Sequence, residues 1–206
     1  MSALTLPLAR RFRDHHGIAS SHDLRVLNLS SEQRRSLLQR GVLEEVFEGV
    51  YHLASTPLDV EARCAAVCAA DVSLVISCCS ARALSSLRRC SSRRLHATTD
   101  RATKPLGRGV VVHRTKSLPA GDIIDRGDGI RVTSAARTLF DQAKHVDGLT
   151  LISIGEQILD LELATVVERV TDTAIAANLS GVVGELVGLY IQRRHQVGIG
   201  RSARGA

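Results

Sequence analysis

Seven polar side chains fall between positions 31 and 40, interrupted only by two leucines and one acid. Arg can form two hydrogen bonds with guanine and Gln with adenine, while a Ser hydroxyl reaches phosphate or base. On a helix, such side chains could enter the major groove of a DNA duplex, although a solvated helix face would carry the same residue types. The candidate DNA-binding residues are Ser31, Gln33, Arg34, Arg35, Ser36, Gln39 and Arg40.

A second group of charges lies between residues 88 and 116. It contains nine Lys or Arg residues and one acid, Asp100, and it accounts for most of the net charge of +7 over residues 56–146. Such a block attracts phosphate and binds it less tightly as salt rises. A solvated loop and strand face, or the Arg and Ala richness of a GC-rich genome, would also explain it. The candidate phosphate contacts are Arg88, Arg89, Arg93, Arg94, His113 and Arg114.

The residues that could perform catalysis or bind a metal form no recognisable motif. Cys64 and Cys68 share a helix face, but no C-x-x-C pair or nearby His pair completes a zinc site, so buried core cysteines are expected. The odd count of five cysteines and the lack of a secretory signal argue against a disulfide framework. The chain has no G-x-S-x-G motif, no Glu followed two residues later by Lys, and no His assigned to Cys78 or Cys79. We therefore predict no enzyme activity, no catalytic residue, no metal and no cofactor.

Composition excludes several classes of protein. Hydrophobic residues make up 44% and charged residues 23% of the 206, which is typical of a globular chain. Five aromatic residues are too few for the base-stacking mode of single-stranded nucleic-acid binding. No apolar run is long enough to span a membrane, and three arginines interrupt any secretory leader, although an Arg-rich helix could mimic a transit peptide. We expect a cytoplasmic protein without a membrane partner.

The elements that would position residues 31–40 are helical at first and extended afterwards. Apolar spacing predicts three helices: one over 6–15, a second that begins at Ser20 or Ser21, and a third over 31–40. Ser30 and Gln33 form a capping box at the start of the third helix. Runs at 42–47 and 50–54 flank Glu48-Gly49 and predict a hairpin. Residues 1–55 are thus expected to form a winged helix-turn-helix DNA-binding domain, with the third helix in the major groove.

Three acids in the hairpin, Glu44, Glu45 and Glu48, oppose contact between this wing and phosphate. Either the wing stays off the DNA backbone, or affinity is low without the basic segment.

A second unit is expected over residues 58–190. Patterning predicts a helix at 60–70, a strand at 71–76, a helix at 80–87, strands at 94–99, 110–114, 122–125 and 130–132, a helix at 135–144 and further helix from Gly148. Arg137 and Asp141, four residues apart, are expected to form a structural ion pair. Residues 196–206 are polar and Gly-rich, and we expect a disordered tail. The predicted fold class is α+β: the winged helix-turn-helix, then a mixed α/β domain with a small sheet and a helical C-terminus.

Several motifs resemble those of the AbiEi-family antitoxins of type IV toxin–antitoxin systems, in the form common in actinobacteria. The likeness covers about residues 8 to 175. The segments that carry it are 16–20 with Leu24 and 29–30, the recognition-helix segment 33–43, Gly49-Val50-Tyr51, Val112-His113-Arg114-Thr115, the turn 118–122, and 129–141 of pattern G-I-x-V-T-S-x-x-R-T-L-x-D. The chain departs from the family at Ser77-Cys78-Cys79-Ser80, where members often have S-H-R-S, and in its acidic wing.

The resemblance implies a two-part protein. The N-terminal domain would bind double-stranded DNA at its own promoter, and the larger domain would supply the antitoxic activity. The partner would be a nucleotidyltransferase-like toxin, countered without a stable complex, and no C-terminal endonuclease domain is expected. A protein-interaction module, or a decayed family member without specific DNA binding, is the alternative function.

Overall fold

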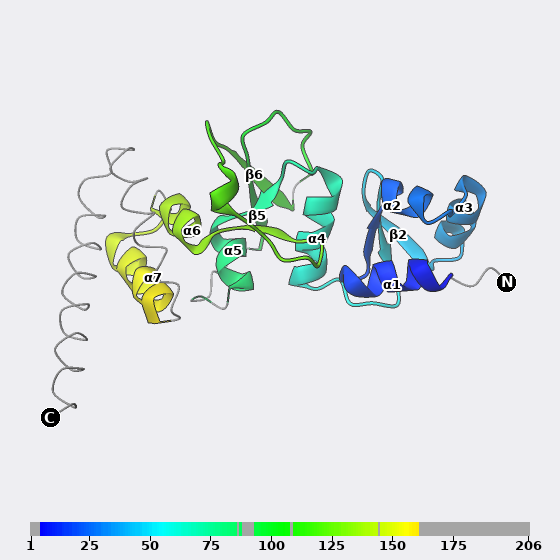
Figure 1. Cartoon of the computed structure of the whole chain (residues 1–206), viewed down its shortest axis with the longest axis horizontal. Helices are drawn as coiled ribbons and strands as arrows, with labels where there is room; N and C mark the ends of the chain where they lie inside the picture. Colours follow the sequence, from blue (N-terminus) through cyan, green and yellow to red (C-terminus); the bar gives the residue numbers. More distant parts are fainter. Residues whose placement is uncertain (1–4, 86, 88–92, 108, 144, 161–206) are drawn as a thin grey trace, which may run out of the picture.

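The computed structural model describes residues 5–85, 87, 93–107, 109–143 and 145–160. Helices and two small sheets make up this part of the chain, which confirms the α+β class. The molecule is elongated, with α3 toward one end and α7 toward the other (Figure 1). Arg88, Arg89, the glycines at 181, 184 and 188 and the tail 196–206 lie outside the described residues.

The N-terminal unit combines three helices with a three-stranded antiparallel sheet of order β1-β3-β2. Its elements are α1 (Leu6–Asp14), β1 (Ile18–Ser20), α2 (Ser21–Val26), α3 (Ser31–Gln39), β2 (Leu43–Phe47) and β3 (Val50–Leu53). The three helices and the hairpin match the prediction within a few residues, whereas β1 was not predicted. Three residues are too few to show a periodicity, and β1 exists because it pairs with β3.

Local signals begin and end these helices. Pro7 lies in the first turn of α1, where its missing N–H costs nothing. Ser20 and Asp23 form a capping box at α2, and Ser30 and Gln33 form the predicted one at α3. The apolar sides of the helices and the hairpin then close one core, which contains Leu8, Phe12, Leu24, Leu37, Leu43 and Tyr51.

The second unit is built on a five-stranded mixed sheet of order β6-β5-β4-β8-β7. Its elements are α4 (Val60–Ala70), β4 (Val75–Ile76), α5 (Cys78–Leu84), β5 (Leu95–Thr99), β6 (Val110–Arg114), β7 (Ile123–Asp125), β8 (Arg131–Thr133), α6 (Ala135–Gln142) and α7 (Gly148–Asp160), with a 3-10 turn at Ala120–Asp122. The predicted strand at 71–76 is shorter than expected, because the Asp71 carboxylate accepts hydrogen bonds from the Ser73 N–H and the Thr103 hydroxyl and holds a turn there.

Helix α4 packs between the two sheets. One continuous core contains Ile18 and Val50 from the first sheet, the buried side of α4, and Ile76 and Ala97 from the second sheet. A polar network also joins the two units. Arg126 lies 3.0 Å from Glu61 and 2.9 Å from Asp128, and His16 of the first unit lies 3.0 Å from Asp128 of the second. The predicted units therefore share a core across the boundary at 55–58.

The described helices include none that is both long and apolar enough to cross a membrane.

Candidate functional site

Helix α3 is held by its ends and by one apolar contact. The Ser30 hydroxyl accepts the Gln33 N–H at 3.1 Å, and the Gln33 side-chain oxygen accepts the Ser30 N–H at 2.9 Å. Leu37 is buried in the N-terminal core, and the helix ends at Gln39, with Arg40 as its C-cap before Gly41, which adopts a φ of 67°. Anchoring through Leu37 turns the polar side of α3 outward.

The seven predicted DNA-binding residues differ in what remains available to a ligand. All are exposed except Arg34, which is half-buried with its guanidinium 5.5 Å from the centre of the Tyr51 ring. Gln33 has committed its oxygen to the helix cap. Within the described part of the chain, the side chains at positions 35, 36, 39 and 40 have no hydrogen bond or ion pair. We call Arg35, Ser36, Gln39 and Arg40 the α3 surface.

The hairpin acids have partners within the protein. The Glu45 carboxylate accepts the Gly49 N–H at 2.8 Å, and Glu48 lies 3.5 Å from Lys104 of the second unit. The Ser21 N–H donates to the Gly49 carbonyl at 2.7 Å, which fixes the turn to the start of α2. The turn and residues 102–106 line a cleft of about 850 Å³. The hairpin tip therefore faces the second unit.

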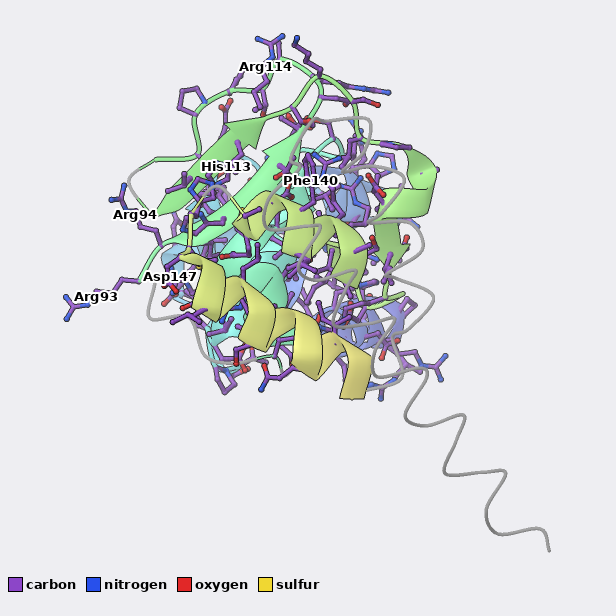
Figure 2. All side chains as sticks on the ribbon, turned by 90° about the vertical axis from the view of Figure 1, so that its left-hand side faces the viewer. Arg93, Arg94, His113, Arg114, Phe140 and Asp147 are labelled. Carbon is purple, nitrogen blue, oxygen red and sulfur yellow. The ribbon has the colours of Figure 1, made fainter. Side chains whose placement is uncertain are left out.

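The described residues of the basic segment do not form one surface with α3. Arg93 and Arg94 precede β5, while Arg114 ends the parallel neighbour β6, level with Thr99. At the rise of a strand, Arg94 and Arg114 are roughly 16 Å apart along the sheet. All three are exposed and lie at the edges of the second unit, with Arg93 and Arg94 apart from Arg114 (Figure 2). His113 is half-buried, and its side chain points to the opposite face of the strand from Arg114.

Three of the family-like motifs meet at Arg137. Its guanidinium donates to Asp141 at 3.0 Å, to Asp122 at 3.1 Å, to the Thr115 hydroxyl at 3.1 Å and to the Ser117 carbonyl at 3.2 Å. This confirms the predicted ion pair of Arg137 and Asp141 and shows it to be part of a larger network. The guanidinium is buried, so the motifs around residues 115, 122 and 137 have a structural role in joining β6, the 3-10 turn and α6.

A cluster that the sequence analysis missed lies between the second sheet and α5. Cys78 is the first residue of α5, and its sulfur and one nitrogen each of His96 and His113 all lie within 4.8 Å of one another. His96 Nδ1 and His113 Nε2 are 2.9 Å apart, and the two rings stack with centroids 5.2 Å apart. His145 follows, with its ring centroid 5.3 Å from that of His113. We call Cys78, His96 and His113 the Cys–His cluster.

Strand pairing explains why these residues converge. The Ser77 N–H donates to the His96 carbonyl, which brings the end of β4 alongside β5, and Thr98 pairs in register with His113. Side chains alternate along a strand, so Leu95 and Ala97 pack on the α4 side while His96 lies on the other face, toward α5. Cys78 has a φ of 50°, the left-handed region that a non-glycine residue seldom adopts.

The electrostatics of this region follow from burial. Desolvation and the neighbouring histidines lower the pKa of His96 and of His113, so both rings are neutral at neutral pH. Burial, together with the nearby Asp141 carboxylate, raises the pKa of the Cys78 thiol to about 11. Burial also raises the pKa of Asp141 despite its contact with Arg137. Neutral imidazoles and a protonated thiol are therefore the resting groups of the cluster.

The cysteines divide into two kinds. Cys64 and Cys68 are free and buried in α4, as predicted, and burial raises the pKa of Cys64 to about 12. Cys79, in contrast, is disulfide-bonded, which the expectation of no disulfide framework did not foresee. An odd number of cysteines leaves one thiol unpaired at least, but it does not prevent two that are close in space from pairing.

No family model matches the chain, and a search of curated proteins finds no significant match.

Proposed function

We propose that this chain is a cytoplasmic, DNA-binding transcriptional regulator. It is the antitoxin of a type IV toxin–antitoxin system, represses its own promoter and counteracts a nucleotidyltransferase-like toxin. The observation that carries the proposal is the α3 surface, a solvent-facing set of Arg, Ser and Gln side chains on a well-capped helix.

The order of elements supports this assignment. A helix, a short strand, two further helices and a hairpin, with the first strand paired to the last, are the elements of a winged helix-turn-helix. In that arrangement the last helix enters the major groove and its exposed side chains contact base edges. In this chain that helix would be α3, which lies toward one end of the molecule (Figure 1).

The chemistry of the α3 surface supports sequence-specific contact. Arg35 and Arg40 are exposed and have no protein partner in the described part of the chain, so they can each donate two hydrogen bonds to a guanine. Gln39 can pair with an adenine edge, and Ser36 can reach a phosphate oxygen or a base. The hairpin tip faces the second unit, so its acids need not approach phosphate.

The antitoxin assignment rests on the AbiEi-like motifs of the second unit. The network around Arg137 gives these motifs a common structural role. Their effect on the toxin is tested by co-expression with a nucleotidyltransferase encoded beside the gene. We expect growth to be rescued by the full chain, and persistent arrest in the presence of folded protein would contradict the antitoxin role.

The experiment for DNA binding is an anisotropy titration of the full chain on its own upstream DNA and on a scrambled duplex of equal length, at two salt concentrations. We expect tighter binding to the upstream DNA and weaker binding at the higher salt. Equal, weak binding to both duplexes would contradict a sequence-specific regulator.

One observation favours a second function, that of a protein-interaction module without specific DNA binding. Glu44 and Glu48 of the hairpin leave most of their side chains in solvent, and exposed acids repel phosphate. Equal affinity for the upstream and scrambled duplexes in the titration would favour this second function.

A further inference from the structure

The Cys–His cluster groups three potential metal ligands in the second unit. It is independent of the proposed DNA contact, because α5, β5 and β6 belong to the second unit and lie away from α3 (Figure 1). Cys78 is buried, whereas His96 and His113 are half-buried, so the cluster lies at the edge of the interior with one side accessible. Three side chains of types that bind metal ions therefore lie close together, although they come from three elements and are 17 or more positions apart in the sequence.

The types of atom in the cluster define the class of ligand. A thiolate sulfur and two imidazole nitrogens are ligands of zinc and similar transition ions, whereas magnesium and calcium prefer oxygen. Tetrahedral zinc with ordinary Zn–S and Zn–N bonds holds its ligand atoms about 3.4 to 3.7 Å apart. The cluster atoms lie within 4.8 Å of one another, and His96 Nδ1 and His113 Nε2, which form a hydrogen bond at 2.9 Å, would have to move about 0.5 Å apart to bind the ion. Small side-chain rotations would therefore complete the geometry.

Asp141 provides a second, independent observation. Its Oδ1 accepts the hydrogen bond from Arg137, while its Oδ2 is buried and has no hydrogen-bond partner among the described residues. The carboxylate lies close enough to Cys78 and His113 to act electrostatically on both. A carboxylate behind a histidine ligand is the usual arrangement around protein-bound zinc, where it accepts the second ring N–H and orients the imidazole.

We propose that Cys78, His96 and His113 bind one zinc ion, with Asp141 as the carboxylate behind His113. Three protein ligands leave a fourth position for water. On binding, the Cys78 S–H bond breaks, the sulfur becomes a thiolate ligand and the proton passes to solvent. The ion joins the start of α5 to strands β5 and β6, so it stabilises the second unit against unfolding.

The test is a titration of the metal-stripped full chain with Co²⁺, followed by displacement with Zn²⁺. We expect saturation at one ion per chain, visible bands of tetrahedral cobalt, and a near-ultraviolet thiolate-to-cobalt band that zinc removes. Zinc should also raise the melting temperature. Absence of stoichiometric binding in the folded protein would overturn the proposal.

Variants identify the ligands. Cys78→Ser should abolish the thiolate-to-cobalt band, and His113→Asn should weaken binding by at least 100-fold. Asp141→Asn should weaken it by 10- to 100-fold. Because Cys78 and Asp141 are buried, circular dichroism establishes that each variant is folded, and the half-buried His113 provides a test that does not depend on them.

Matched controls are Cys64→Ala, which removes a free buried thiol from α4, and His22→Ala, which removes an exposed imidazole from α2. Both should bind cobalt as the wild type does. Loss of the thiolate band in Cys64→Ala with retention in Cys78→Ser would overturn the assignment. Alkylation of Cys78 at an unchanged rate in the presence of saturating zinc would do so as well.

Discussion

The α3 surface lies within ten consecutive residues, whereas the Cys–His cluster draws on three elements between residues 78 and 113. The first is exposed and depends on a helix with local caps; the second is partly buried and depends on strand pairing. Contacts near in sequence can be recognised from residue types and spacing. Contacts distant in sequence require the sheet register, which no local pattern specifies.

Removing the centre of the long-range network should have the largest effect on stability. Arg137→Ala leaves the carboxylates of Asp122 and Asp141 without their buried partner. We expect the free energy of unfolding to fall by about 3–5 kcal/mol, measured by urea denaturation. Arg114→Ala, an exposed change at the end of β6, is the control and should cost about 0.5 kcal/mol or less. A loss below about 1 kcal/mol for Arg137→Ala would show that the network is not a structural centre.

Removing a local cap should have a smaller effect. Ser30→Ala deletes the hydroxyl that accepts the Gln33 N–H and should lower the free energy of unfolding by about 1 kcal/mol. Ser31→Ala is the matched control, since Ser31 is the first helical residue and its hydroxyl caps nothing. Equal losses in chemical denaturation would mean that the capping box does not hold α3.

Acidification should reveal the ionised cap of α2. Burial raises the pKa of Asp23, but hydrogen bonds from Ser20 and the Arg11 guanidinium outweigh burial, and the net shift is downward. A lowered folded-state pKa stabilises the protein above the unfolded value of about 4, and this stabilisation is lost as pH falls through the folded value. At pH 7 the free energy of unfolding of the wild type should exceed that of Asp23→Asn by roughly 0.3–1 kcal/mol, and this difference should disappear in acid.

The measurement is urea denaturation of wild type and Asp23→Asn across a pH series, with Asp14→Asn as an exposed control. A difference between wild type and Asp23→Asn that stays constant from pH 7 into acid would refute the ionised cap.

Removing the contact between the hairpin and the second unit should have the smallest effect on stability and on DNA affinity. Glu48 and Lys104 are 85–88% exposed, so Glu48→Gln should change stability by no more than about 0.5 kcal/mol. DNA affinity should change by about twofold or less, because the hairpin tip faces residues 102–106. A large gain in affinity in the same anisotropy titration would instead indicate that the wing approaches phosphate.

Much of the fold could be predicted from the sequence. The α3 capping box, the helix after Ser134 and the hairpin around Glu48-Gly49 depend on neighbours within a few residues. The short strand β1 and the turn at Asp71 could not be predicted, since each depends on a distant partner, β3 or Thr103.

The same limit explains the sites. The residues of the α3 surface were predicted by type and spacing, whereas the histidines beside Cys78 lie 18 and 35 positions away. One signal was available: His96 interrupts an otherwise apolar or β-branched strand, and His113 directly follows three valines. The disulfide at Cys79 was missed because pairing depends on distance in space.

The most direct test of recognition through the α3 surface compares arginines of α3 with exposed arginines of the second unit. Upstream DNA is titrated at fixed salt with Arg35→Ala and Arg40→Ala, and with Arg93→Ala and Arg114→Ala as matched surface changes. The α3 variants should each lose roughly 1–3 kcal/mol of binding free energy, and the second-unit variants less than about 0.5 kcal/mol. Unchanged binding by the α3 variants, or equal losses of binding free energy in the α3 and second-unit variants, would contradict recognition through the α3 surface.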